Sequence, residues 1–317
     1  MKGGGSGRRG GETPMVPEAE FGSYYGRPVL KETVWGPDIP AYLFLGGLAG
    51  ASSALAAGAQ LSGHPELART AKTGAAGAIS LSMVALVHDL GRPTRFVNML
   101  RVLKVTSPMS VGTWLLSAYT PLALASAASA VTGRLPRAGL AATLPAAVLG
   151  PAVAAYTSVL LGDTAAPAWN GARRELPYLF VGSAATAAGG LGLLAVSPER
   201  AGPAARLATV GAAAELTAEW LLDRRLGRAA EPYRTGASGA LMRAGRILAA
   251  GGTAAALLGR RSRALSALSG AALLAGSAVT RFGVFEAGRA SARDPRYTVG
   301  PQRERLSERD EAGAVSA

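Results

Sequence analysis

The sequence predicts an all-α integral membrane protein with about eight transmembrane helices, arranged as two four-helix bundles. Only 17% of the 317 residues are charged, and 49% are hydrophobic. Soluble domains carry about 25% charged residues, so this chain is depleted in charge. Glycine and alanine are abundant while aromatic residues are few, a composition typical of helices that pack closely in lipid through small faces.

Long runs without a charged residue mark the individual spans. Four runs contain no Asp, Glu, Lys or Arg, and each exceeds the roughly 20 residues that cross a bilayer as a helix. Four weaker segments complete the set, and the charges near their ends (Lys72, Arg243 and Arg281) are expected to snorkel to the interface. The charge-free runs are 39–61, 105–133, 138–162 and 176–198, and the weaker segments are 70–89, 207–222, 241–259 and 264–281.

Polar segments flank the predicted membrane domain, which covers residues 35–285. Residues 1–34 form a Gly-rich polar tail with no apolar core, so no signal peptide is expected. Residues 286–317 form a charged tail that is expected to be disordered.

Two thirds of the 33 lysines and arginines fall in the two tails and in the second, fourth and sixth loops. With eight spans these segments share one side, and the positive-inside pattern places both termini in the cytoplasm, at the cell membrane. The net charge of +13 therefore reflects topology, and no nucleic-acid partner is expected.

The residue types that are scarce exclude several redox centres. The chain has no cysteine, so it cannot hold an iron–sulfur cluster by thiolates or form a disulfide. Its two histidines, His64 and His88, are expected on opposite sides of the membrane, where they cannot ligate one haem together. We therefore expect no haem, no iron–sulfur cluster and no metal site in this chain.

A dense polar block, HDLGRPTRFVNMLRVLKVTSPMSVGTW (88–114), separates two apolar spans. Apolar residues at 96, 99, 100 and 103 keep helical spacing and predict a short amphipathic surface helix. Ser107 is the expected N-cap of the next span. A positive-inside loop accounts for the charge, but the concentration of polar residues favours a docking surface or site. The block holds His88, Asp89, Arg92, Arg95, Asn98, Arg101, Lys104 and Trp114.

Two further polar patches are expected on the same side. Tyr156 lies inside an apolar run, where its hydroxyl needs a partner, although a tyrosine near an interface is often an ordinary belt residue. Asp163, Trp169, Asn170 and Arg173 follow it. The third patch, 35–50, brings Asp38 and Tyr42 into the first span, together with glycines that let another helix or a flat ligand approach the backbone.

Two carboxylates, Glu215 and Glu219, lie one helical turn apart in the sixth span. Carboxylates inside a membrane are costly and point to proton or ion movement. The alternative is a structural pairing with Arg224, Arg243 or Arg246, and both interpretations stay open.

Four blocks, in this order and spacing, resemble the NrfD/PsrC family of membrane subunits of polysulfide-reductase-like complexes. The blocks are PAYLFLGGLAG (40–50), HDLGRP-x-RF-x-NMLR-x-x-K-x-TSPMSVG-x-W (88–114), Y-T-x-x-L-L (156–161) and PAWN-x-AR-x-x-LP (167–177). The resemblance covers roughly residues 35–285 and is specific in the first five helices.

The resemblance implies an electron-transport role in anaerobic respiration. It implies a ferredoxin-like subunit with 4Fe-4S clusters and a molybdopterin catalytic subunit as partners, membrane lipid around the helices, and a quinone, expected to be menaquinone, beneath the docking face. Tyr156 matches the tyrosine of the fourth helix that contacts a quinone oxygen. Relatives hold the other oxygen with His and Asn at the head of helix one, where this chain has Asp38. Many relatives place their catalytic subunits outside the cytoplasm, which disagrees with the charge distribution here.

The candidate residues fall into three groups. The quinone set is Asp38, Tyr42, His88, Asp89, Trp114 and Tyr156. The docking set is Arg92, Arg95, Asn98, Arg101, Lys104, Trp169, Asn170 and Arg173. The proton-transfer set is Asp163, Glu215 and Glu219.

Two other classes of function remain open. A proton or solute transporter would use the two glutamates, but the chain shows no inverted repeat. A purely structural membrane anchor would use none of the candidate residues. The sequence does not indicate the terminal substrate, since that chemistry belongs to another chain.

Overall fold

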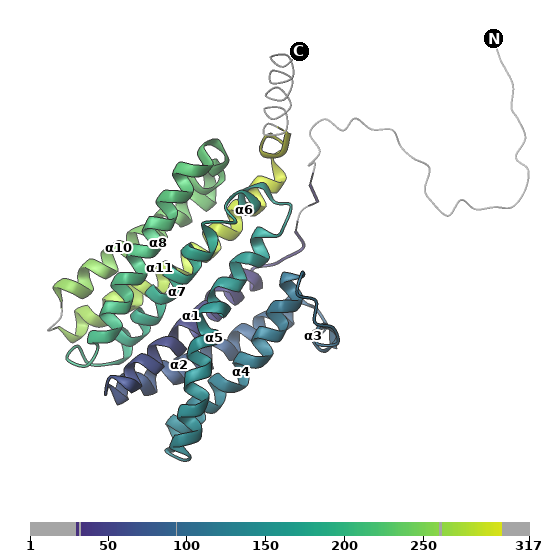
Figure 1. Cartoon of the computed structure of the whole chain (residues 1–317). Coiled ribbons are helices and arrows are strands. Elements are labelled where there is room, and N and C mark those ends of the chain that lie inside the picture. Colours follow the sequence, from purple (N-terminus) through teal and green to yellow (C-terminus); the bar gives the residue numbers. More distant parts are fainter. Residues whose placement is uncertain (1–29, 32, 93, 260–261, 300–317) are drawn as a thin grey trace, which may run out of the picture.

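The computed structural model describes residues 30–299 apart from 32, 93 and 260–261. The described residues contain helices and no strand. Eight long helices run side by side and alternate in direction (Figure 1). They are α1 (Asp38–Leu61), α2 (Pro65–Asp89), α4 (Pro108–Thr132), α5 (Pro136–Gly162), α7 (Leu176–Ala195), α8 (Gly202–Leu226), α10 (Gly236–Leu258) and α11 (Arg263–Arg293). Short helices lie between them: α3 (Thr94–Met99), α6 (Pro167–Gly171), η1 (Gly227–Ala230) and α9 (Glu231–Arg234).

Local sequence signals set where α4 begins and ends. Pro108 occupies its first turn, where a missing N–H costs nothing. The Ser107 hydroxyl accepts a hydrogen bond from the Ser110 backbone N–H at 3.4 Å, which confirms the predicted N-cap. Gly133 ends the helix in the left-handed conformation with φ of 69°, which glycine adopts without strain.

Six of the long helices have the length and composition of a membrane span: α1, α2, α4, α5, α7 and α11. Helices α8 and α10 fall outside this set. Charged side chains lower their hydropathy, notably Glu215 and Glu219 in α8 and Arg243 and Arg246 in α10. The protein is therefore a multi-pass helical membrane protein, while the count of eight spans stays a prediction.

Helix α1 occupies the centre of the molecule. It packs against α2 and α5 on one side and against α7 and α11 on the other. A side chain at Gly50 would place Cβ only 2.2 Å from the carbonyl oxygen of Gly150, so the backbones of α1 and α5 touch there. Gly47 packs less tightly against α7, where a Cβ would lie 3.3 Å from the Ala184 methyl group. The glycines of α1 thus admit neighbouring helices.

The helices pack mainly within two sets of four. One set contains α1, α2, α4 and α5, and the other contains α7, α8, α10 and α11. Because α1 also packs against α7 and α11, the two sets share a continuous contact. Two separate four-helix bundles therefore stay a prediction.

Helix α11 corrects two predictions. It continues to Arg293, so the expectation of a disordered tail from residue 286 is wrong for residues 286–293. Buried Val284, Phe285 and Ala287 explain why the helix persists, because they pack into the core. The extension leaves Arg281 well inside the helix and fully buried, so it does not snorkel. Residues 1–29 and 300–317 of the predicted tails lie outside the described residues.

Arg243 and Lys72 are the other two residues whose charges were expected to snorkel to the interface. Arg243 reaches toward the end of its helix, where Nη1 donates to the Arg234 carbonyl at 2.9 Å. Lys72 is buried, and its Nζ donates to Gln60 Oε1 at 2.6 Å. The Lys72 amine therefore binds a partner near the end of α1, and its contact with the interface stays a prediction.

We expect Gly50→Ala to destabilise the protein, because the new methyl group would overlap the backbone of α5 at Gly150. Overpacking of this kind costs typically about 1–3 kcal/mol. Thermal unfolding of the purified protein in detergent measures the effect. Gly58→Ala on the same helix is the matched control, since nothing lies within 4 Å of a Cβ there. Equal melting temperatures for the two variants would contradict the close contact.

Candidate functional site

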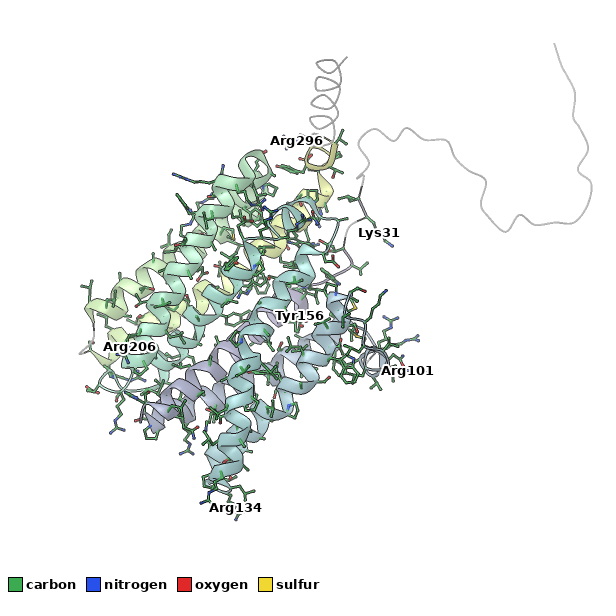
Figure 2. All side chains as sticks on the ribbon, in the orientation of Figure 1. Lys31, Arg101, Arg134, Tyr156, Arg206 and Arg296 are labelled. Atoms are coloured by element: carbon green, nitrogen blue, oxygen red, sulfur yellow. The ribbon has the colours of Figure 1, made fainter. Side chains whose placement is uncertain are left out.

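Three polar segments that are far apart in the sequence meet at one end of the molecule, which we call the polar end. It contains the start of α1, the end of α2 with α3, and the end of α5 with α6 (Figure 1). Figure 2 shows Lys31, Arg101 and Arg296 near this end, whereas Arg134 and Arg206 lie at the opposite end. The sequence predicted this shared side.

Asp38, His88 and Asp89 tie the start of α1 to the end of α2. His88 Nδ1 lies 2.8 Å from Asp38 Oδ2, close enough for a hydrogen bond or an ion pair. Asp89 Oδ1 accepts a hydrogen bond from the Gly36 backbone N–H at 3.3 Å. The side chain of His88 is 76% exposed and that of Asp38 is 34% exposed, so this pair lies at the rim and contacts water.

Tyr42 and Tyr156 lie beneath this rim. Tyr42 follows Asp38 by about one helical turn and is buried, and its hydroxyl has no hydrogen-bond partner in the described part of the chain. Tyr156 of α5 is its neighbour and packs against the same core. The Tyr156 ring rests on Gly112 of α4, where a Cβ would lie 1.7 Å from the ring carbon Cζ. Three helices therefore converge on two adjacent phenols.

Gly112 is a site residue that the sequence reasoning missed. It belongs to the 88–114 block, and its position two residues before Trp114 gave no sign that a tyrosine from α5 would cover it. Trp114 itself is 42% exposed. Two residues span about 200° around a helix, so Trp114 points away from the Tyr156 ring.

The segment after α2 is exposed but held at both ends. Arg95 Nη1 donates to the Leu90 carbonyl at 2.9 Å. The Ser110 hydroxyl donates to the Val102 carbonyl at 3.0 Å and accepts from the Lys104 backbone N–H at 2.9 Å. The predicted amphipathic helix is only the six-residue α3, and none of its residues is buried. The segment therefore offers basic and apolar side chains to a partner: Arg92, Arg95, Asn98, Arg101, Lys104, Val97, Val102 and Leu103.

Trp169 is the clearest correction among the docking candidates. Its side chain is fully buried, and its Nε1 donates to the Val284 carbonyl at 2.8 Å. Its ring lies 6.0 Å from that of Trp35 and 5.6 Å from that of Phe285, and it covers Gly288. Trp169 thus fastens α6 to α11 and does not reach the surface.

The other residues of the second patch remain at the surface. Asp163 ends α5 and is exposed. Asn170 is exposed, and its Nδ2 donates to the Gly162 carbonyl at 3.1 Å. Arg173 is also exposed. These three side chains border the polar end beside α6.

Glu215 and Glu219 lie apart from the tyrosines, in the second set of helices. Glu219 Oε2 accepts a hydrogen bond from Arg246 Nε at 2.8 Å, as the structural alternative predicted for this residue. Arg224 stacks on Trp220 instead, 4.0 Å from the ring centroid. Glu215 faces Arg281, which the sequence reasoning had placed at the interface. Among the described residues, no group of three or more His, Asp or Glu side chains is arranged to hold a metal ion.

The apolar helices and the polar end together define a multi-pass membrane protein with one specialised face. A family model described as polysulphide reductase, NrfD, matches residues 29–202, which is more than half of the chain. The chain belongs to the NrfD family. This membership indicates a membrane subunit that associates with a redox enzyme in a respiratory oxidoreductase. A comparison with curated proteins found no match.

We expect Trp169→Phe to lower the stability of the protein, because the Val284 carbonyl would lose the indole donor. The Val284 carbonyl keeps its bond within α11, so the loss is that of one buried hydrogen bond, about 0.5–1.5 kcal/mol, together with the packing of the larger ring. Trp220→Phe is the matched control, since Trp220 is 50% exposed. Melting temperatures in detergent measure both variants. A loss no greater for Trp169 than for Trp220 would contradict the structural role.

Proposed function

We propose that this protein is the quinone-binding membrane subunit of an oxidoreductase, passing electrons between a partner's iron–sulfur clusters and the membrane quinone pool. The observation that carries this proposal is the meeting of Tyr42 and Tyr156 beneath the Asp38–His88 pair. Membership of the NrfD family supports the association with a redox enzyme.

The residues at the polar end have the chemistry that a quinone head group requires. A quinone is flat and neutral, carries two carbonyl acceptors, and takes up two electrons and two protons on reduction. The Tyr42 hydroxyl is buried beside that of Tyr156 and makes no hydrogen bond of standard geometry among the described residues, so it can donate to a carbonyl oxygen. The Tyr156 hydroxyl lies beside it on the surface of α4. The two phenols thus supply donors in an otherwise apolar environment.

The Asp38–His88 pair fits the exchange of protons with water. Imidazole and carboxylate are the common proton-transfer groups, and both contact solvent here while lying about one helical turn above Tyr42. Asp89 holds the chain before α1 through Gly36. In this arrangement Asp38 and His88 receive or deliver protons, and the tyrosines orient the head group.

The exposed segment at 92–104 is the proposed docking surface for the electron-transfer subunit. Electrons have to arrive from another chain, because this one has no cysteine to ligate an iron–sulfur cluster. Arg92, Arg95, Arg101 and Lys104 fit an acidic partner surface, and exposed Val97 and Leu103 add apolar area. We propose a ferredoxin-like partner with 4Fe-4S clusters, and a molybdopterin subunit beyond it.

We also propose that α8 and α10 cross the membrane, giving eight spans. They contain 25 and 23 residues and lie along α7 and α11 (Figure 1). At 1.5 Å per residue each reaches about 35 Å, beyond the roughly 30 Å hydrocarbon core. The Glu219–Arg246 pair reduces the cost of their charges. The excess of basic residues on the side of the polar end supports a cytoplasmic location for this end and for both termini.

Tyr156→Phe should lower quinone-linked turnover of the complex by about tenfold or more. The substitution removes one buried hydrogen bond, which costs about 1–3 kcal/mol. A free-energy difference of about 1.4 kcal/mol corresponds to a tenfold change. Electron transfer to a soluble artificial acceptor should survive, because that path ends at the partner's clusters. Tyr178→Phe is the matched control, since Tyr178 is 72% exposed on α7. Unchanged quinone turnover would remove Tyr156 from the site, and equal loss of both activities would indicate damaged assembly.

Changing Arg95, Arg101 and Lys104 to glutamate should release the soluble subunits and leave this protein in the membrane, because the three side chains are exposed. Co-purification from detergent-solubilised membranes at moderate salt measures the effect. Arg134→Glu with Arg137→Glu at the opposite end is the control. If the triple variant co-purifies as well as the control, the basic segment serves topology alone.

A further inference from the structure

A second polar site lies inside the α7–α8–α10–α11 set. Glu215 and Glu219 of α8 are 1% and 3% exposed. Arg281 of α11 is fully buried and faces Glu215, while Arg246 of α10 binds Glu219. We call these four residues the charged cluster. Charged side chains that are buried in a membrane protein, as Glu215, Glu219 and Arg281 are, need either full pairing or a function.

Glu215 and Arg281 do not complete a pairing. Both carboxylate oxygens of Glu215 lack a hydrogen-bond partner among the described residues, and so do Nε and Nη1 of Arg281. Each unsatisfied buried group costs about 1–3 kcal/mol, and more when it is charged. The opposing charges therefore attract each other across a gap that leaves their hydrogen-bonding groups open.

The hydroxyl groups around Glu215 do not close this gap. Ser183 of α7 donates to Ser277 at 2.9 Å, and Thr186 donates to the Gly182 carbonyl at 3.0 Å. Thr280 of α11 lies close to the carboxylate too, but among the described residues no hydroxyl makes a hydrogen bond of standard geometry to it. The surroundings of Glu215 thus offer polar atoms that a water molecule or a proton could bridge.

Arg281 is held in position by other contacts. Its Nη2 donates to the Phe180 carbonyl at 2.6 Å, and its guanidinium lies 3.8 Å from the centroid of the Phe180 ring. On the other side Gly47 of α1 approaches it, since a Cβ there would lie 3.4 Å from Nη2. A fixed cation close to Glu215 stabilises the ionised carboxylate without neutralising it by direct contact.

A line of charged groups connects Glu215 to the polar end. Glu219 follows Glu215 by one turn and contacts Arg246 at 2.8 Å. Arg246 lies 4.0 Å from Asp223, which contacts Arg234 at 3.1 Å. The side chains of Arg246 and Asp223 are 46% and 28% exposed. Acidic groups therefore recur along α8 from the interior to the aqueous boundary.

We propose that Glu215 is a proton-binding site, loaded from the polar end through Asp223 and Glu219. In each transfer an O–H bond forms on the accepting carboxylate as one breaks on the donor, with water as the first donor, and no electron moves. Arg281 opposes protonation of Glu215 and drives release of the proton. This site lies on different helices from the tyrosines, and it does not depend on quinone binding.

The rival explanation is a permanently ionised structural cluster of two carboxylates and two guanidiniums. Structural ion pairs of this protein make direct contacts, as Arg246 does with Glu219 and Arg225 does with Glu175. Glu215 and Arg281 make no such contact among the described residues. This difference favours a carboxylate that changes its protonation state.

Infrared difference spectroscopy on the full-length protein in lipid vesicles tests the proposal. Lowering the pH should produce the carbonyl band of a buried carboxylic acid, which shifts when glutamate carboxyl carbons carry the heavy isotope and when the solvent is D₂O. The band should disappear in Glu215→Gln. Glu66→Gln, which removes an exposed carboxylate paired with Arg200 at the opposite end, should keep it. Absence of the isotope-sensitive band in the unmodified protein would overturn the proposal, whatever the variants do.

The Glu219→Gln variant distinguishes the proton-binding site at Glu215 from the path by which protons reach it. It should keep the Glu215 band but slow its appearance after a rapid pH jump by about tenfold or more, since proton relays by a positioned group contribute at least this much. Unchanged kinetics would remove Glu219 from the path. A band lost in Glu219→Gln and kept in Glu215→Gln would move the site to Glu219 and overturn the assignment. Quinone turnover of the same variants, in which Tyr156 is unchanged, is measured in parallel. This measurement reports on the tyrosine site alone.

Discussion

Close contact between α1 and its neighbours is the constraint on which the rest of the structure depends. Lipid tails are as apolar as the helices, so burial of apolar surface does not drive helix association, and van der Waals packing has to do so. Gly50 and Gly150 let α1 and α5 touch through their backbones, and Gly47 admits α7. Packing at this distance fixes the depth and rotation of α1. It therefore fixes Asp38 and Tyr42, which lie on the same helix nearer its start.

Polar contacts then hold the polar end on this apolar frame. The Asp38–His88 contact joins α1 to α2, while Trp169 anchors α6 to α11 through the Val284 carbonyl. Buried polar groups are most restrictive when each has a partner, and Trp169 meets that condition while Tyr42 does not. The polar end thus combines a rigid surround with a buried phenol that has no conventional hydrogen bond among the described residues, an arrangement that fits the proposed quinone site.

Much of this architecture followed from the sequence, because charge-free runs and helix caps are local signals. Ser107 as N-cap and the shared side of the polar patches are examples. The errors concern residues whose surroundings come from distant segments. Trp169 lies among polar and basic residues, which indicated a surface segment. Its hydrogen-bond acceptor, the Val284 carbonyl, lies 115 residues away along the chain. Arg281 looked like the end of a span because it is the first charged residue after the charge-free run 264–280, whereas α8 supplies the charge that it faces.

The two helix sets differ in how they treat polar groups, and this difference bears on what each contributes. Among the described residues of the first set, the buried side chains left without a partner are hydroxyl groups, those of Tyr42, Ser52 and Thr120, while Ser53 pairs with Tyr119 and Ser126 with Thr143, each at 2.7 Å. In the second set Glu215 and Arg281 remain open. The NrfD match ends at residue 202, where α8 begins, so the charged cluster lies in the part of the chain that the family model does not reach. Its chemistry therefore has to be inferred from this chain's own residues, and the open Glu215–Arg281 pair is the observation on which the proposed proton-binding site rests.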